Sequence, residues 1–254
     1  KNVMTVDLWL LWVWSLAVWG CNIIIIVNAP QIYRASNENH YDEKVNSLYI
    51  AVIGVGNALG RIFSGVVEEK LMKRGVSITA LFVVPPMTTA TALLLFLVLP
   101  GSAVAIPFLV GSIGYGVSWG VMVLSVRLMF LRDVGKVYNF FFTGAIISIA
   151  SFNRPLFGYF YDETGRDQGI YPNCSGSECF RVPFILFICV NLVATATGWW
   201  AHRRWVANFF NKKEDEDLLL AKDGEGNVCT DEAEKNSGGS GGNQQNGDSV
   251  ALQF

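Results

Sequence analysis

Charge is scarce in this sequence of 254 residues. Asp, Glu, Lys and Arg make up 16% of it, whereas soluble domains average about a quarter. Apolar residues account for 52%, and the mean hydropathy is +0.36. These values exclude an ordinary soluble domain. Histidine is nearly absent too: His40 and His202 are the two in the sequence, and neither belongs to a His/Cys motif with metal-ligand spacing. We therefore expect no metal site and no cofactor.

Several motifs of soluble enzymes are also missing. No G-x-x-x-x-G-K-[ST] segment is present to hold the phosphates of ATP, and no G-x-S-x-G segment presents a nucleophile. The glycine-rich "GSIGYGVSWG" lies inside a long apolar run with no strand before it, so it is not a dinucleotide loop. The apolar segments contain no buried Asp, Glu or His for catalysis. We expect neither an enzyme nor a nucleic-acid-binding protein.

Long uncharged runs are what the sequence has instead. Residues from Leu8 to Tyr33 and from Gly75 to Val126 include no charged side chain. A membrane-spanning helix needs about 20 mostly apolar residues, and the first run is too long for a signal peptide. The sequence predicts an all-α, six-helix transmembrane bundle within residues 1–210. The expected spans are 8–30, 45–67, 77–99, 104–126, 137–160 and 182–202.

The distribution of basic residues predicts the orientation of this bundle. Short cytoplasmic loops are enriched in Lys and Arg. The loops after the second, fourth and sixth spans hold Lys70, Lys73, Arg74, Arg127, Arg132, Lys136, Arg203, Arg204, Lys212 and Lys213. The opposite loops hold only Arg34, Lys44, Arg166 and Arg181. We therefore expect both ends of the chain to lie in the cytoplasm.

Residues 211–254 differ in composition from the rest. They are polar and include the low-complexity segment "SGGSGGNQQNG". This composition predicts a disordered acidic cytoplasmic tail. Glu214 followed by Leu218 and Leu219 fits an acidic dileucine signal that sorting adaptors bind, although such short patterns also arise by chance. If the signal is used, it indicates an endosomal, lysosomal or vacuolar membrane. Otherwise the plasma membrane is equally compatible.

The loop before the last span contains a sequon and two cysteines. Asn173, Cys174 and Ser175 form the pattern N-x-S, and Cys179 follows five positions after Cys174. The predicted side of this loop is extracellular or lumenal, which permits glycosylation of Asn173 and a disulfide between Cys174 and Cys179. A chance sequon and two reduced thiols remain the alternative.

Two arginines fall inside predicted spans. Arg61 follows Asn57 by four residues, so both lie on one helix face, although Arg61 could also extend to the cytoplasmic interface. Arg154 lies between Asn153 and Pro155, where the proline should kink the helix, or it pairs with acidic residues near the outer surface. Ionisable groups at membrane depth predict functional sites. The candidate substrate-binding residues are Asn28, Asn57, Arg61, Tyr115, Trp119, Asn153 and Arg154.

Small residues recur every four positions in two spans. Gly56, Gly60 and Ser64 form one series, and Ser112, Gly116 and Gly120 form the other. Small residues at this spacing allow helix backbones to approach closely. The pattern predicts close helix packing in either a moving transporter or a static bundle.

The charged loop after the second span resembles a known sequence pattern of membrane transporters. The segment "GRIFSGVVEEKLMKRG" is similar to the major facilitator superfamily pattern G-x-x-x-D-[RK]-x-G-[RK]-[RK], matched by Gly65, Glu69, Lys70, Lys73 and Arg74. Glutamate replaces the aspartate, and methionine replaces the second glycine. The segments "NALGRIFSG" and "FNRPLFGYFYDETG" resemble the nodulin-like branch, with monocarboxylate transporters as relatives.

This resemblance implies the C-terminal half of a twelve-helix transporter. It further implies a missing N-terminal six-helix half, alternating access to a small organic solute, and a conformational latch formed by the five loop residues. With two arginines at depth, we expect an organic anion or an amino acid as the substrate. A non-transporting membrane receptor or scaffold on the same bundle is the alternative.

Overall fold

The structure is a computed structural model, which describes residues 6–38, 40–130 and 133–226, with side chains as far as residue 208. The described residues contain helices and no strand. The α-helices are α1 (Val6–Val27), α2 (Ala29–Ser36), α3 (Glu43–Lys73), α4 (Val84–Val98), α5 (Ala105–Met129), α6 (Val134–Ser148), α7 (Tyr159–Asp167) and α8 (Glu178–Gly226). Between them lie 3₁₀-helices η2 (Ile78–Val83) and η3 (Gly101–Ala103) and a π-helix, η4 (Ile149–Gly158).

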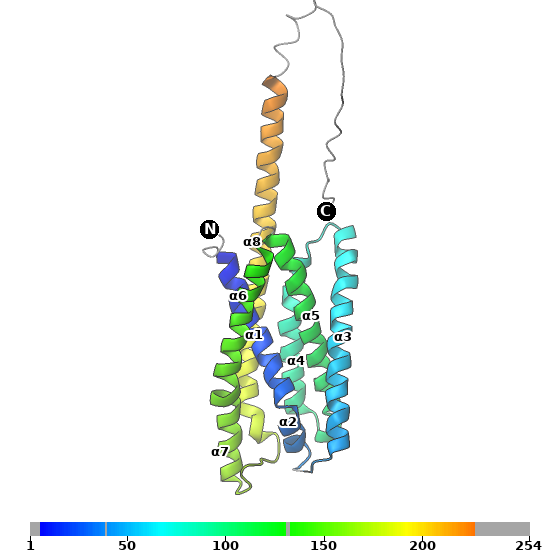
Figure 1. Cartoon of the computed structure of the whole chain (residues 1–254), viewed down its shortest axis with the longest axis vertical. Helices are drawn as coiled ribbons and strands as arrows, with labels where there is room; N and C mark the ends of the chain where they lie inside the picture. Colours follow the sequence, from blue (N-terminus) through cyan, green and yellow to red (C-terminus); the bar gives the residue numbers. More distant parts are fainter. Residues whose placement is uncertain (1–5, 39, 131–132, 227–254) are drawn as a thin grey trace, which may run out of the picture.

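Six helical segments within the described residues are long and apolar enough to cross a membrane, which confirms the predicted all-helical, multi-pass organisation. They are Val6–Val27, Glu43–Lys73, Ile78–Val98, Ala105–Met129, Val134–Asp167 and Glu178–Asn208. Each contains or nearly contains the corresponding predicted span. The segments alternate in direction, and α1 begins at the end of the bundle where α3 ends and α6 begins (Figure 1). The predicted cytoplasmic loops therefore share one end of the molecule.

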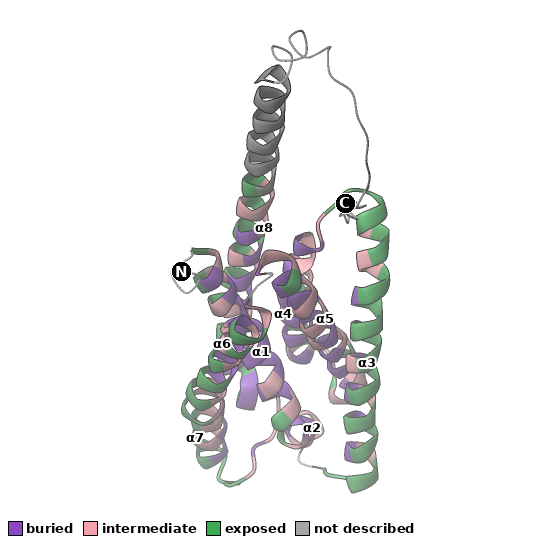
Figure 2. Cartoon of the chain, turned by 45° about the horizontal axis from the view of Figure 1, so that its top comes forward, coloured by how far each residue is buried: buried purple, intermediate pink, exposed green. Residues whose placement is uncertain are grey.

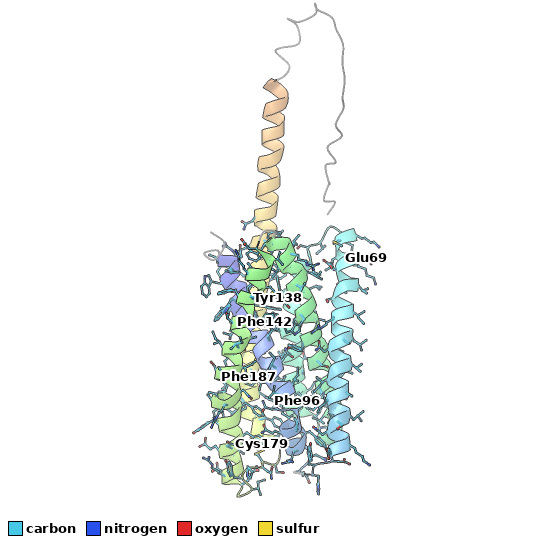
Figure 3. All side chains as sticks on the ribbon, viewed as in Figure 1. Glu69, Phe96, Tyr138, Phe142, Cys179 and Phe187 are labelled. Atoms are coloured by element: carbon cyan, nitrogen blue, oxygen red, sulfur yellow. A yellow bond between two sulfur atoms is a disulfide. The ribbon has the colours of Figure 1, made fainter. Side chains whose placement is uncertain are left out.

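The bundle has two apolar cores, one towards each end. The core near α2 includes Tyr33, Phe96, Phe108, Phe157 and Phe184, all at most 4% exposed. The second core, near the start of α1, is built around large buried aromatic side chains. These include Trp14, Trp19, Phe82 and Phe141. Phe96 and Phe187 lie at the α2 end, whereas Tyr138 and Phe142 lie at the other (Figure 3).

Helix α3 is attached to the bundle along one side only. Its contacts are chiefly with α5, and its outer residues remain exposed, as the largely green ribbon of Figure 2 shows. The exposed side chains are apolar, among them Leu48, Val55 and Ile62, with exposed fractions of 60%, 57% and 64%. In a bilayer these side chains meet lipid tails instead of water, so their exposure costs little.

The fifth span departs from the simple kink predicted at Pro155. Residues Ile149–Gly158 form a π-helix that joins α6 to α7 without interruption. Proline lacks the N–H group that an α-helix would use and clashes with the preceding turn, and a wider turn relieves both problems. The irregularity is therefore spread over ten residues instead of one point.

The prediction of disorder from residue 211 does not hold for the first part of the tail. Helix α8 continues through the predicted boundary to Gly226. The segment "KKEDEDLLLAK" is rich in Lys, Glu, Leu and Ala, which favour helix, and its composition alone did not reveal this. Residues 227–254 lie outside the described residues.

Candidate functional site

Arg61 lies within the apolar part of α3, near the end that the basic residues predict to be cytoplasmic. Glu68, the next charged residue of the helix, follows it by seven residues, which corresponds to about 10 Å of helix. The Nε of Arg61 donates a hydrogen bond to Asn57 Oδ1 at 3.2 Å, as the four-residue spacing predicts. The side chain is exposed on the surface of the bundle. The structure therefore places a cation within the apolar part of the span, between Asn57 and the charged end of the helix.

Five aromatic side chains form a cluster around Trp119, the tryptophan over which this arginine lies. We call them the aromatic cluster: Trp19 of α1, Tyr115 and Trp119 of α5, and Tyr138 and Phe142 of α6. The indoles of Trp19 and Trp119 are stacked, with centroids 4.6 Å apart and an interplanar angle of 14°. Phe142 lies 5.4 Å from Trp19 and 5.3 Å from Trp119. Tyr138 and Phe142, labelled in Figure 3, are 5.2 Å apart.

The guanidinium of Arg61 connects α3 to this cluster. Its Cζ lies 5.5 Å from the centroid of the Trp119 ring, within the range of a cation–π interaction. Tyr115 and Tyr138 lie next to the same tryptophan, with ring centroids 5.9 Å and 6.5 Å from Trp119. Four helices, α1, α3, α5 and α6, thus contribute to one site.

The seam of small residues between α3 and α5 positions Arg61. A Cβ added to Gly60 would lie 2.9 Å from Gly116 Cα and 2.8 Å from Val117 N, so the two backbones touch. A Cβ on Gly116 would in turn lie 3.0 Å from Gly60 Cα. Arg61 follows Gly60 directly, and Trp119 follows Gly116 by three residues. Close backbone contact therefore brings the guanidinium over the indole.

The structure separates the other predicted binding residues from Arg61. Asn28, at the break between α1 and α2, donates a hydrogen bond from Nδ2 to Asn153 Oδ1 of η4 at 2.7 Å. A second bond from Asn28 Nδ2 reaches the carbonyl of Ile24 at 2.8 Å. Arg154 is exposed, and its guanidinium forms no ion pair with any described residue. Of the seven predicted residues, Asn57, Arg61, Tyr115 and Trp119 thus form one group, and Asn28 and Asn153 form a second.

The proposed latch residues lie at the end of α3. Lys73 Nζ pairs with Glu69 Oε1 at 2.7 Å within the same helix, and the two side chains are 72% and 65% exposed. Gly65 is also exposed, and a Cβ there would meet nothing within 4 Å. Lys70 and Arg74 are exposed as well. In this conformation the pair does not bridge two helices, so a latch stays a prediction.

The loop between α7 and α8 is tied to its neighbours at the sequon. Cys174 and Cys179 form a disulfide and are both fully buried. Asn173 Oδ1 accepts a hydrogen bond from Arg34 Nη1 of α2 at 2.6 Å. Ser175 exchanges two hydrogen bonds with the side chain of Gln168. This hydrogen bond uses Oδ1 of Asn173, so Arg34 does not engage Nδ2, the atom to which a glycan would be attached.

The predicted sorting residues Glu214, Leu218 and Leu219 fall in the last part of α8. Their side chains lie outside the described residues. Whether adaptors bind them stays a prediction.

Sequence reasoning missed three members of the aromatic cluster, Trp19, Tyr138 and Phe142. The four-residue spacing of Tyr138 and Phe142 places them on one helix face, which was an available signal. Which helix that face meets depends on tertiary packing, which one sequence does not reveal.

No cluster of three or more His, Cys, Asp or Glu side chains that could hold a metal ion occurs among the described residues. No protein-family model, no curated protein and no solved structure matches this chain. Any assignment of function therefore rests on the resemblance at residues 60–75 and on the geometry around Arg61.

Proposed function

We propose that these six helices form one half of a secondary transporter of the major facilitator type, which moves a small organic anion or amino acid across a membrane by alternating access. The resemblance of the Gly65–Arg74 loop to the superfamily pattern supports this family. Six antiparallel membrane-spanning segments are the number that one half of such a transporter requires.

Arg61 is the observation that favours an anionic substrate. A charged side chain within the bilayer is costly and typically faces a polar cavity or pathway. Arg61 is exposed on the bundle, and it contacts the neutral amide of Asn57 and the aromatic ring of Trp119. Its positive charge therefore has no carboxylate partner among the described residues. A carboxylate of the substrate would supply the missing charge.

A second six-helix half would complete the site. Transporters of this type bind their substrate between two halves, which rock about it. The site around Arg61 lies on the surface of the bundle, so this chain supplies one wall of it. We expect liposomes that hold only this chain to show no uptake, and uptake there would contradict the two-half proposal.

Uptake by cells that express the full-length protein tests the function. Radiolabelled monocarboxylates and amino acids would be offered to native protein, Arg61→Gln and Arg154→Gln, with the amount at the membrane measured for each. Charge-assisted hydrogen bonds contribute about 1.5–3 kcal/mol, so Arg61→Gln should reduce uptake by at least about tenfold. Arg154→Gln is the matched variant, because it removes an exposed arginine of η4, a segment that contributes no residue to the aromatic cluster.

Two results would change the proposal. Full uptake by Arg61→Gln would remove this arginine from the transport cycle. Loss of uptake in Arg154→Gln alone would move the substrate site to the group formed by Asn28 and Asn153. If no compound on the panel is taken up by the native protein, the receptor or scaffold alternative gains support.

A further inference from the structure

The aromatic cluster combines one buried ring with four that are partly exposed. Trp19 is fully buried, whereas Tyr115, Trp119, Tyr138 and Phe142 keep part of their surface accessible. The buried indole of Trp19 donates a hydrogen bond from Nε1 to Ser118 Oγ at 3.1 Å and stacks on Trp119 from behind. The buried Trp19 therefore supports the outer rings, which keep accessible ring surface within the membrane-spanning region.

These rings are arranged with their faces at differing angles. Trp119 and Phe142 are tilted by 52°, and Tyr138 and Phe142 meet edge to face at 77°. Tyr115 meets Trp119 at 82°. Such an arrangement offers both ring faces and ring edges to a further aromatic group, which prefers offset-stacked or edge-to-face contacts. An aliphatic body of the same size gains apolar contact there but no ring–ring interaction.

Arg61 provides the charge next to these rings. Its guanidinium lies over Trp119, with Cζ 5.5 Å from the ring centroid. A planar, bidentate donor of this kind matches the geometry of a carboxylate. Cation and aromatic surface are thus presented together by α3, α5 and α6.

We propose that the substrate of this site is a planar aromatic carboxylate, whose carboxylate group binds Arg61 and whose ring packs against Trp119, Tyr138 and Phe142. The proposal rests on the proposed function and deepens it by naming the substrate class. Aromatic pairs contribute beyond simple burial of area, enough to favour an aromatic ligand over its saturated analogue by about two- to tenfold.

Benzoate and cyclohexanecarboxylate test this class, because they carry the same carboxylate on a flat aromatic and on a saturated six-membered ring. The chain would be placed in lipid nanodiscs, and dissociation constants measured by saturation-transfer difference NMR titration, a method that detects weak binding. Empty nanodiscs correct for partition of each compound into lipid. Native protein should bind benzoate about two- to tenfold more tightly than cyclohexanecarboxylate. Arg61→Gln should lose both.

Phe142→Leu should remove the preference for benzoate while leaving the binding of cyclohexanecarboxylate within about twofold. Phe140→Leu is the matched control: it lies on the same helix and contacts Trp9 and Trp12, outside the cluster. It should keep the preference. Circular dichroism would show that each variant retains its helices, and Tyr138→Leu replaces Phe142→Leu if the latter does not fold.

The outcomes separate the two proposals. Equal binding of both compounds, lost in Arg61→Gln, would overturn the aromatic class and leave the anion site in place. Absence of any protein-dependent signal, or binding that survives Arg61→Gln, would overturn the anion site and the aromatic class together. A preference that persists in Phe142→Leu and is lost in Phe140→Leu would place the ring-binding surface elsewhere and contradict the inference.

Discussion

Helix α5 presents two faces that pack by different physical means. Towards α3 it offers Ser112, Gly116 and Gly120, and the helices approach until their backbones touch. Towards α1 and α6 it offers Tyr115 and Trp119, whose rings contact other rings at centroid distances of 4.6–6.5 Å. The first face permits backbone contact because its side chains are small or absent, whereas the second packs through large aromatic side chains.

This difference indicates which face can change with the substrate. Every Cβ added in the seam would collide with backbone or with a serine hydroxyl, so the seam permits almost no substitution. The rings of the cluster are partly exposed, and other side chains would fit there without moving a helix. The seam therefore determines the position of Arg61, and the aromatic cluster determines which side chains surround its guanidinium.

The largest effect is expected from Gly60→Ala, which breaks the seam. The new methyl group would lie within 3.0 Å of Gly116 Cα and Val117 N, and neither backbone atom can move independently of its helix. We expect the free energy of unfolding to fall by about 2 kcal/mol. Unfolding by graded addition of SDS, followed by circular dichroism, measures it.

Gly54→Ala is the control for that measurement. It lies on the same helix, and a Cβ there meets nothing within 4 Å. Removal of a helix-interior glycine should raise stability by about 0.5–1 kcal/mol. Equal effects of the two substitutions would show that α3 and α5 do not touch as described.

A smaller effect is expected from Trp119→Leu, which alters the aromatic face. The substitution removes the stacking on Trp19 and the cation–π contact with Arg61. These interactions predict a loss of about 1 kcal/mol in the free energy of unfolding, measured in the same way. Trp200→Leu, at a tryptophan that is 54% exposed, should change it by less than about 0.5 kcal/mol. A greater loss in Trp200→Leu would refute the importance of the stack.

The smallest effect is expected from Glu69→Gln, which lies outside both faces. The ion pair with Lys73 is exposed and within one helix, so its removal should change the free energy of unfolding by less than about 0.5 kcal/mol. Glu178→Gln, which breaks the exposed pair with Arg181, is the matched control. A loss above about 1 kcal/mol at Glu69 alone would indicate that Glu69 bridges two helices in a populated conformation, as the latch requires.

The features predictable from sequence were those that local spacing determines. Uncharged length predicted the spans, and the four-residue recurrence of Gly56, Gly60 and Ser64 predicted a close helix contact. The same spacing predicted that Asn57 would lie next to Arg61. In each case one helix face contains the information, because the α-helix has a known period.

The features that could not be predicted depend on which helices meet. Asn28 and Asn153 are 125 positions apart, and each alone resembles any other asparagine in a span. Tyr138 and Phe142 acquire their meaning only when α6 lies beside Trp19 and Trp119. The helical continuation of α8 past residue 211 is a different case, because polar composition alone does not distinguish an exposed helix from a disordered tail.

The length of α8 has a geometric consequence. The helix spans 49 residues, and the part after Asn208, the end of its apolar segment, extends for 18 residues or about 27 Å. Each residue of an α-helix advances by about 1.5 Å and rotates by about 100°. Insertion of a single residue after Asn208 would therefore turn the segment that holds Leu218 by more than a quarter of a revolution. The number of residues in the helix therefore determines both how far its end lies from the bundle and how that end is rotated about the helix axis.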